Sequence, residues 1–408
     1  MSIPTPAGGR YARLVLVLGL LSATAALSTD TYLPAFPAMA RDLAATESQV
    51  QATLAGSLIG LGLGQIVTGP LSDALGRRRP VLVGVTLHIV ASLLCAIAPN
   101  VSFLIAFRLV QGLAGTAGMI AATAVVRDLF VGRRAAVLYS RMALVMGLTP
   151  VIAPTVGGFM LAVTSWRGVF LALAVIGVVM LVLTALWLPE TLPPQRRHVL
   201  GMATALRAYG SLFRDPVFLM MIAVVGLASA SIFTYVSASP FVLQNMYGMS
   251  AQSFGLVFGG VALSIVAMSQ VNPLLLARFG IITTQTLILA TAVVSVLVML
   301  VVVSNGWGGW WGYVLPLVGI VGGLPAQQAN SAAMALHHQG AASGTASAML
   351  GAARFGVGGL ATPLVGLLLG STPVPSVVML TVTTGLGLAL FLLVRPRLRG
   401  YLQEDRGR

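Results

Sequence analysis

Long apolar runs, separated by short polar segments, follow one another along the whole chain. Each run is close to the length of about 20 residues that a helix needs to cross a bilayer. We therefore expect an all-α integral membrane protein with twelve transmembrane helices. The runs lie at Leu14–Phe36, Val50–Leu71, Pro80–Ala98, Phe103–Val126, Val137–Val163, Gly168–Leu188, Val217–Phe241, Phe254–Leu276, Thr284–Val303, Trp310–Met334, Gly344–Leu369 and Ser376–Val394.

The amino-acid composition agrees with this pattern. Hydrophobic residues make up 57% of the 408 positions and charged residues only 8%, whereas soluble domains carry about 25% charged residues. The net charge of +14 would suggest a nucleic-acid partner if the arginines formed one patch. They recur instead in alternate loops, so we expect the lipid bilayer as a partner and no nucleic acid.

The arginine content of the loops predicts the orientation in the membrane. Positively charged loops stay in the cytoplasm, so we expect both termini on the cytoplasmic side. The membrane is expected to be the inner membrane of a bacterium. The N-terminal segment, with Arg10 and Arg13 before an apolar run, resembles a signal peptide. Cleavage would leave an odd number of spans, so we expect the first span to be retained. One set of loops holds only Arg41 and Arg167, whereas the other holds Arg10, Arg13, Arg77, Arg78, Arg79, Arg127, Arg133, Arg134, Arg196, Arg197, Arg207, Arg214, Arg278 and the arginines of the C-terminal tail.

The longest loop divides the chain into two halves of similar length. We predict six-helix bundles at 1–190 and 216–408, joined by a cytoplasmic linker at 191–215 that contains an interfacial helix. The sequence Pro-x-x-Gly at 154–157 recurs at 363–366, and Gly76 has a weaker counterpart in Gly280. Repeats of this kind are typical of transporters built by duplication.

Two charged residues lie inside the spans of the first half. Asp30 is about 24 Å from the cytoplasmic side, and Arg108 is roughly 7 Å below the outer surface of a core about 30 Å thick. An unpaired charge at such depth costs at least about 2.5 kcal/mol. We therefore predict that Asp30 and Arg108 face a shared cavity and interact. The alternative is that each side chain reaches separately to the outer interface.

Asp30 is the only acid placed inside a span, which makes it the candidate for proton coupling. Burial and a nearby guanidinium act on the proton affinity of a carboxyl group in opposite senses. Such a group can load a proton from one side of the membrane and release it to the other. A substrate that disturbs its contact with Arg108 would couple proton movement to transport.

The segment Gly69–Arg79 resembles the loop signature between the second and third spans of the major facilitator superfamily, with Ala74 in place of the usual Arg. The resemblance implies the major-facilitator fold, with twelve helices in two six-helix repeats. It also implies an inner latch between the halves, for which the alternative is ordinary loop charge. The latch candidates are Gly69, Asp73, Gly76, Arg77 and Arg127.

Two further spans resemble signatures of the same superfamily. The fourth contains Arg108, Gln111 and Gly112, as in its R-x-x-Q-G pattern. The fifth, from 147 to 158, resembles the antiporter signature, with Ala153 replacing one glycine. In the family this signature accompanies export, and physically it offers a kinked, closely packed hinge. The hinge candidates are Pro150, Pro154, Gly157 and Gly158.

Three more segments narrow the resemblance. Ser28–Pro37, Leu188–Leu192 and Ser239–Gln244 look like the bicyclomycin/chloramphenicol-resistance (Bcr/CflA) branch of drug:proton antiporters. The resemblance implies export of small amphipathic drugs or metabolites in exchange for protons, by a monomer that needs no cofactor.

Polar or adaptable side chains inside the spans are candidates for the substrate cavity. Arg354 lies near mid-membrane, where it could attract an anionic or polar substrate group or a partner that the sequence does not identify. For the amides and methionines, helix packing is the alternative. The cavity candidates are Tyr32, Gln111, Met142, Met146, Tyr235, Asn272, Gln328, Asn330 and Arg354.

The sequence favours a secondary active efflux transporter that works by alternating access and is not an enzyme. No histidines or cysteines have metal-ligand spacing, so no metal site is expected. One alternative is an uptake symporter or facilitator for a nutrient or metabolite, with the same fold. A second is a membrane enzyme or receptor, which would need a catalytic cluster or an added soluble domain.

Overall fold

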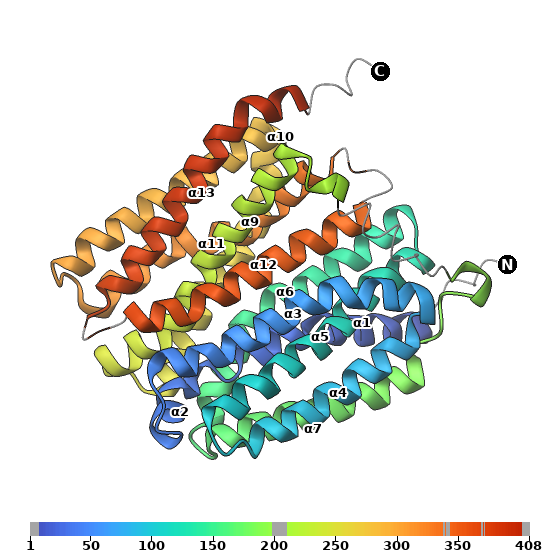
Figure 1. Ribbon diagram of the computed structural model, residues 1–408, viewed down its shortest axis with the longest axis horizontal. Coiled ribbons are helices and arrows are strands. Elements are labelled where there is room, and N and C mark those ends of the chain that lie inside the picture. Colours follow the sequence, from blue (N-terminus) through green and yellow to red (C-terminus); the bar gives the residue numbers. More distant parts are fainter. Residues whose placement is uncertain are drawn as a thin grey trace.

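The computed structural model describes residues 8–197, 210–337, 339, 343–368, 370 and 372–401, and the described part is helical without strands. The helices form two groups that lie side by side (Figure 1). The first group, called the first half below, holds α1 (Gly9–Asp30), η1 (Leu33–Ala35), α2 (Phe36–Asp42), α3 (Glu47–Leu75), α4 (Arg78–Ala96), α5 (Val101–Leu129), α6 (Gly132–Met160) and α7 (Trp166–Trp187). The second half holds α9 (Pro216–Phe241), η3 (Val242–Met246), α10 (Ala251–Ser304), α11 (Gly309–Leu336), α12 (Ser343–Leu368) and α13 (Val374–Tyr401); η2 (Pro194–Arg196) precedes it.

The expected twelve crossings are confirmed once α10 is divided. This element is 54 residues long and breaks at Gly280, which has φ 72° and ψ 167°. At 1.5 Å per residue it would reach about 80 Å, more than twice a hydrocarbon core. Since eleven described helices are long and apolar enough to span a membrane, α10 supplies two crossings and the total is twelve.

Local polar residues explain where several helices begin. Thr46 and Gln49 form a capping box at the start of α3. Asn100 accepts a hydrogen bond from the Phe103 amide at the start of α5. Asp215 accepts the first free amides of α9. Such side chains satisfy amides that the helix itself leaves without acceptors.

The chain reverses direction at Gly76, beyond Leu71, the expected end of the second apolar run. Helix α3 runs through Pro70 to Leu75. A proline has no N–H and leaves one backbone carbonyl oxygen of the helix without its donor. Within a bundle, neighbouring groups can supply the missing hydrogen bond, so the helix can continue. Gly76 then takes φ 94°, which an L side chain rarely adopts.

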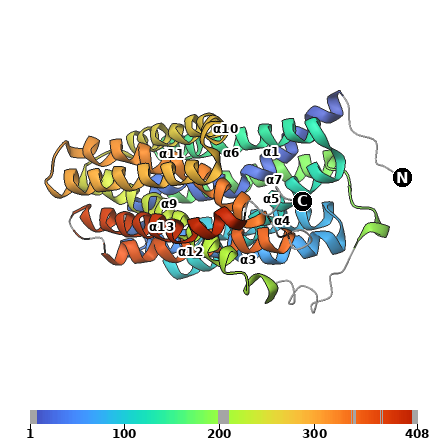
Figure 2. The ribbon, with the colours of Figure 1, turned by 90° about the horizontal axis from the view of Figure 1, so that it is seen from above.

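The two halves pack mainly through α3 against α12 and α6 against α10. The view from above agrees that α3 and α12 lie side by side (Figure 2). Glycines allow this approach, because a Cβ at Gly359 would lie 3.2 Å from the Ala55 carbonyl oxygen and one at Gly255 would lie 2.5 Å from the Pro154 carbonyl oxygen. Most of the expected interfacial helix at 191–215 lies outside the described residues.

Candidate functional site

Asp30 is the last residue of α1, and its side chain is buried, with 9% of its surface exposed. The Thr29 hydroxyl donates a hydrogen bond to its carboxylate at 3.1 Å. The carboxylate also lies close enough to the Tyr235 hydroxyl of the second half for electrostatic interaction. The one carboxyl group inside a membrane crossing therefore stands where the two halves face each other.

Arg108, on α5, is completely buried inside the first half. Its Nη1 donates to the Ser28 carbonyl oxygen at 3.0 Å and to the Gln111 side-chain oxygen. The guanidinium lies 4.1 Å from the centre of the Tyr32 ring, and the Phe170 ring lies 5.7 Å away. Aromatic faces attract such a cation, so these contacts offset part of the cost of burying it.

The expected contact between Asp30 and Arg108 is not formed in this structure. Among the described residues no ion pair joins them, although their charges still interact at longer range. Arg108 binds the backbone two residues before Asp30, so it belongs to the interior of the first half. A joint role in proton coupling stays a prediction.

The cavity candidates of the first half are mostly enclosed. Tyr32 is buried and its hydroxyl lies 3.2 Å from that of Thr53. Gln111 accepts from Arg108 and donates to Ser92 at 2.7 Å. Met142 belongs to an apolar cluster, whereas Met146 is 38% exposed. For Gln111 and Met142 the packing alternative describes this conformation better than a cavity wall.

The cavity candidates of the second half bind each other or nearby hydroxyls. Asn272 and Asn330 exchange two hydrogen bonds, at 3.2 and 3.1 Å. Gln328 donates to Ser229 at 3.1 Å. Tyr235 stacks on Phe258 with ring centres 5.1 Å apart. The amides therefore join helices in this conformation, as the packing alternative describes, and their part in a substrate cavity stays a prediction.

The hinge signature of α6 lies where three helices cross. A Cβ at Gly157 would overlap the Thr31 carbonyl oxygen, next to Asp30. A Cβ at Gly158 would lie 2.5 Å from the Ala251 carbonyl oxygen at the start of α10. Pro150 and Pro154 lie within the same helix. The small residues therefore allow α6 to touch both the end of α1 and the second half.

Hydrogen bonds between the halves gather at one end of the molecule, which we call the sealed end: the part formed by residues 31–51, 155–167, 237–255 and 362–366. Gln51 donates to the Ser237 carbonyl oxygen at 3.1 Å, and Ser48 donates to that of Pro363 at 2.9 Å. Gln244 donates to the Pro34 carbonyl oxygen at 3.0 Å. A surface hollow of about 550 Å³ lies at this end. Every hydrogen bond between the halves within the described residues lies here.

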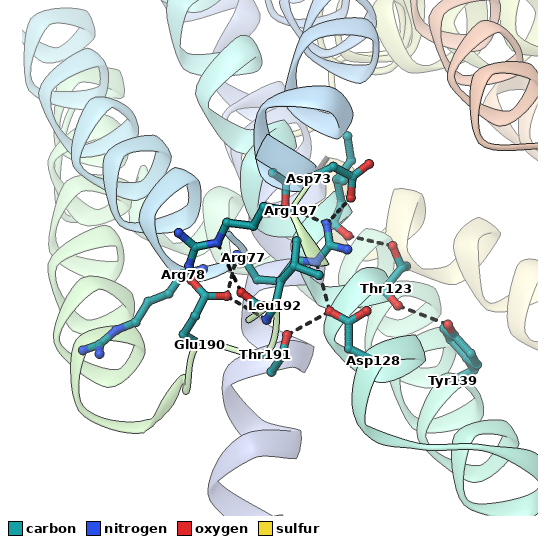
Figure 3. Close-up of polar contacts among 12 residues, drawn as sticks. Asp73, Arg77, Arg78, Thr123, Asp128, Tyr139, Glu190, Thr191, Leu192 and Arg197 are labelled. Atoms are coloured by element: carbon teal, nitrogen blue, oxygen red, sulfur yellow. Dashed lines mark hydrogen bonds and ion pairs between the residues drawn. The ribbon is translucent and has the colours of Figure 1, made fainter. Parts of the chain in front are cut away.

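The opposite end, called the basic end because its loops carry most arginines, holds an ionic network of the first half (Figure 3). Arg77 pairs with Asp73 at 2.5 Å and with Asp128 at 3.0 Å. Burial alone would lower the pKa of the Arg77 guanidinium, but its bonds to Asp128 and Asp73 outweigh burial and raise that pKa. Thr191, at the start of the linker, also donates to Asp128.

Glu190 extends this network through backbone amides. Its carboxylate accepts from the Arg77 and Leu192 amides, both at 2.9 Å, and pairs with Arg197 at 3.7 Å. A Cβ at Gly76 would collide with the Glu190 carboxylate. This approach and its positive φ together explain the glycine of the motif. Glu190 therefore fastens the turn after α3 to the start of the linker.

Among the residues that the structure describes, the latch between the halves is not formed in this conformation. Asp73 and Arg77 bind within the first half, and the open surroundings of Gly69 give no contact with α12. Arg127 is exposed, and its neighbour Asp128 takes the place in the network that was expected for it. The latch therefore remains a proposal for another conformation.

The sequence also missed several residues that the structure singles out. Glu190 follows a span on the arginine-rich side, and its position there gave no sign of its contacts with backbone amides. At the sealed end, Gln51 is completely buried and Asp42 accepts hydrogen bonds from Trp166 and Arg167. A polar residue at the second position of an apolar run was the available signal for Gln51. Among the described residues no cluster of potential metal ligands is found.

Replacing Glu190 by Gln should loosen the linker attachment. The amide keeps the shape of the side chain but loses its charge and one acceptor, and a hydrogen bond to a charged group contributes about 1.5–3 kcal/mol. Hydrogen exchange at the amides of residues 77, 78 and 192 should accelerate about tenfold or more. Unchanged protection at these amides would contradict the assigned role.

Comparison with known proteins agrees with this architecture. The family model of the major facilitator superfamily matches residues 18–361. The chain belongs to the major facilitator superfamily. It is 35% identical over 398 residues to the uncharacterized MFS-type transporter YdgK of Bacillus subtilis, covering 96% of this chain and 98% of that one. This facilitator is therefore a multi-pass bacterial membrane transporter and not an enzyme.

A second relative points to the branch expected from the first span. The bicyclomycin resistance protein homolog of Haemophilus influenzae is 28% identical over 361 residues, covering 88% of this chain and 90% of the relative. The mutant nucleoside transporter NupG has the same fold, with a TM-score of 0.75 at 13% identity, covering 96% of this chain and 100% of that one. The bicyclomycin resistance relative confirms the resemblance to the bicyclomycin/chloramphenicol branch.

Proposed function

We propose that this facilitator is an efflux transporter that exchanges protons for small amphipathic drugs or metabolites. Asp30 is its coupling carboxylate, which is protonated from one side of the membrane and deprotonated toward the other. Relatives named for resistance to bicyclomycin and to chloramphenicol suggest antibiotics of these kinds as cargo. The transporter acts as a monomer.

One observation carries the proposal: a buried carboxyl group lies at the end of α1, next to the hinge signature of α6 and within electrostatic range of the second half. Thr31, the next residue, packs on Gly157 of the hinge signature. The charge of the carboxylate also acts on the Tyr235 hydroxyl of the second half. Gain or loss of a proton at Asp30 changes the charge at this crossing, and a charge buried at an interface is costly unless it is compensated. Protonation therefore biases how the halves pack.

The driving force is sufficient for concentrative export. A membrane potential of 100 mV supplies about 2.3 kcal/mol per charge moved, and one unit of pH gradient adds about 1.4 kcal/mol. Since about 1.4 kcal/mol corresponds to a tenfold ratio, one proton supports export of about a hundredfold or more.

The orientation and the two-bundle division are part of the same proposal. The basic end faces the cytoplasm by the positive-inside rule, with both termini there. The six-helix bundles are 1–190 and 216–408, and 191–215 is the linker. The structure then corresponds to a state closed on the outer side. In the opposite state Asp73, whose side chain is 42% exposed, would reach α12 and form the latch.

Everted membrane vesicles from cells that express the transporter test the proposal. Chloramphenicol should accumulate inside energised vesicles, and a protonophore should abolish the accumulation. The alternative of an uptake symporter of this fold predicts that expression raises accumulation in whole cells. Export that persists unchanged with the protonophore would overturn the antiport proposal.

A further inference from the structure

Arg354 lies midway along α12, and no hydrogen bond or ion pair joins its side chain to another described residue. It is 11 residues beyond the start of the helix, which places it about 16 Å from the basic end. Its side chain is partly exposed, and its Nε is buried without a hydrogen-bond partner. Its guanidinium lies 5.3 Å from the ring of the neighbouring Phe355. This depth is well inside the hydrocarbon core, beyond the lipid phosphates.

The acidic residues that the structure describes are engaged elsewhere. Asp30 is bound by Thr29, and the remaining described acids lie at the ends of the molecule. They form ion pairs or hydrogen bonds with other residues there: Asp42, Glu47, Asp73, Asp128, Glu190 and Asp215. Within the described ranges, therefore, no ion pair satisfies Arg354.

The other arginine of the membrane interior is held differently. Arg108 is wholly buried between aromatic rings and bound by a backbone carbonyl group and Gln111. Arg354 has no such enclosure, and it remains partly exposed at the junction of the two halves. A cation at this depth without compensation is costly, and a bound anion would supply the missing charge.

A polar side chain from the first half lies one turn away. A Cβ at Gly351 would be 3.1 Å from the Gln65 side-chain oxygen, so the absence of a side chain at Gly351 leaves room for that amide. Residues 351 and 354 are neighbours on one face of α12. The Gln65 amide of α3 therefore lies against α12 within about one helical turn of Arg354, near the contact between the halves.

We propose that Arg354, assisted by Gln65, binds the anionic group of the cargo, so that the preferred substrates are amphipathic molecules with a carboxylate or similar charge. This inference rests on the proposed transport function and specifies its substrate class. A guanidinium recognises a carboxylate through two parallel hydrogen bonds, and an amide adds a further donor. Cationic amphiphiles lack this interaction and are repelled.

Dye binding to the purified protein in detergent tests the inference. Fluorescein is anionic at neutral pH, and rhodamine 123 is a cationic dye with the same ring system. Fluorescence anisotropy should give about tenfold tighter binding of fluorescein by the wild type. Arg354→Gln should weaken fluorescein binding about tenfold and leave rhodamine 123 within about twofold. Arg141→Gln is the matched control, since Arg141 is exposed on α6 beside Tyr11.

Several outcomes would overturn the inference. Equal binding of the two dyes by the wild type is one, and an Arg354→Gln effect no larger than that of Arg141→Gln is another. If the glutamine variant does not fold, Arg354→Lys decides, because lysine keeps the charge but loses the paired hydrogen bonds. It should weaken only fluorescein binding, and an unchanged affinity or an equal loss for both dyes would refute the assignment.

The binding assay needs no proton gradient. A wild type that prefers fluorescein but shows no protonophore-sensitive export would refute the antiport proposal and leave the anion site standing. Proton-driven export by a wild type that does not prefer fluorescein would refute the anion site and leave the antiport proposal standing.

Discussion

Asp30→Asn should reduce proton-driven export to the level of vesicles without the transporter. Asparagine has nearly the same shape as aspartate but takes up no proton at neutral pH, so the coupling step is lost while the packing around α1 is kept. The ratio of substrate concentration inside the vesicles to that outside should fall about a hundredfold or more, because one proton supplies about that much driving force. Accumulation of chloramphenicol in everted vesicles measures it.

Substrate exchange without a gradient provides the internal control. Asp30→Asn should still exchange labelled for unlabelled substrate across the membrane, since the carrier can cycle with an uncharged side chain at this position. Asp30→Glu, which keeps a titratable group, should retain part of the gradient-driven export. Export by the asparagine variant at the wild-type level would remove Asp30 from the coupling mechanism.

Gly157→Ala should damage the crossing of α6 with the end of α1. The added Cβ would overlap the Thr31 carbonyl oxygen, and rotation of a side chain cannot relieve a clash with backbone. Overpacking of this kind costs about 1–3 kcal/mol. We expect a lower melting temperature in detergent and a transport rate reduced about tenfold or more.

Gly147→Ala is the matched control on the same helix. A Cβ at Gly147 would lie 3.9 Å from the nearest atom, a methyl group of Val266, which is an ordinary contact. Since alanine is also the better helix former by about 0.5–1 kcal/mol, this variant should be as stable as the wild type or more so. If the two alanine variants have the same transport rate and the same melting temperature, the close crossing at Gly157 is not required for transport or stability.

The sequence predicted the arrangement of the helices well, because span length and loop charge depend on the membrane and not on details of packing. Gly76 and Gly280 illustrate how far this went. Their weak sequence correspondence predicted duplicated positions, and both take similar backbone angles, with φ 94° and 72° and ψ 171° and 167°. A glycine at equivalent reversals is required by the conformation, so it could be recognised from the residue alone.

The contacts inside the site were harder to predict. Counting residues along a helix gives the depth of a side chain, and Asp30 and Arg108 do lie near each other in depth. It does not give the rotation of one helix against another, and Arg108 faces the interior of its own half. For the same reason the sequence could place Asn272 and Asn330 inside spans but not show that they bind each other.

The network around Glu190 was missed for a different reason. Its most important acceptor contacts are with backbone amides of residues 77 and 192, which every residue except proline carries. No side-chain pattern in the sequence marks such a contact. The reversal at Gly76 could be recognised, whereas the carboxylate that fills the space beside it could not.

The sealed end is also held through backbone groups. Gln51, Ser48, Gln244 and Thr155 each donate to a main-chain carbonyl oxygen of the opposite half. Any amino acid presents that oxygen, so the accepting positions are free to diverge in evolution while the closing bonds persist. Covariation between residues of the two halves should accordingly be weak at the sealed end. Substitutions selected by drugs should accumulate there at the positions whose carbonyl oxygens accept the hydrogen bonds.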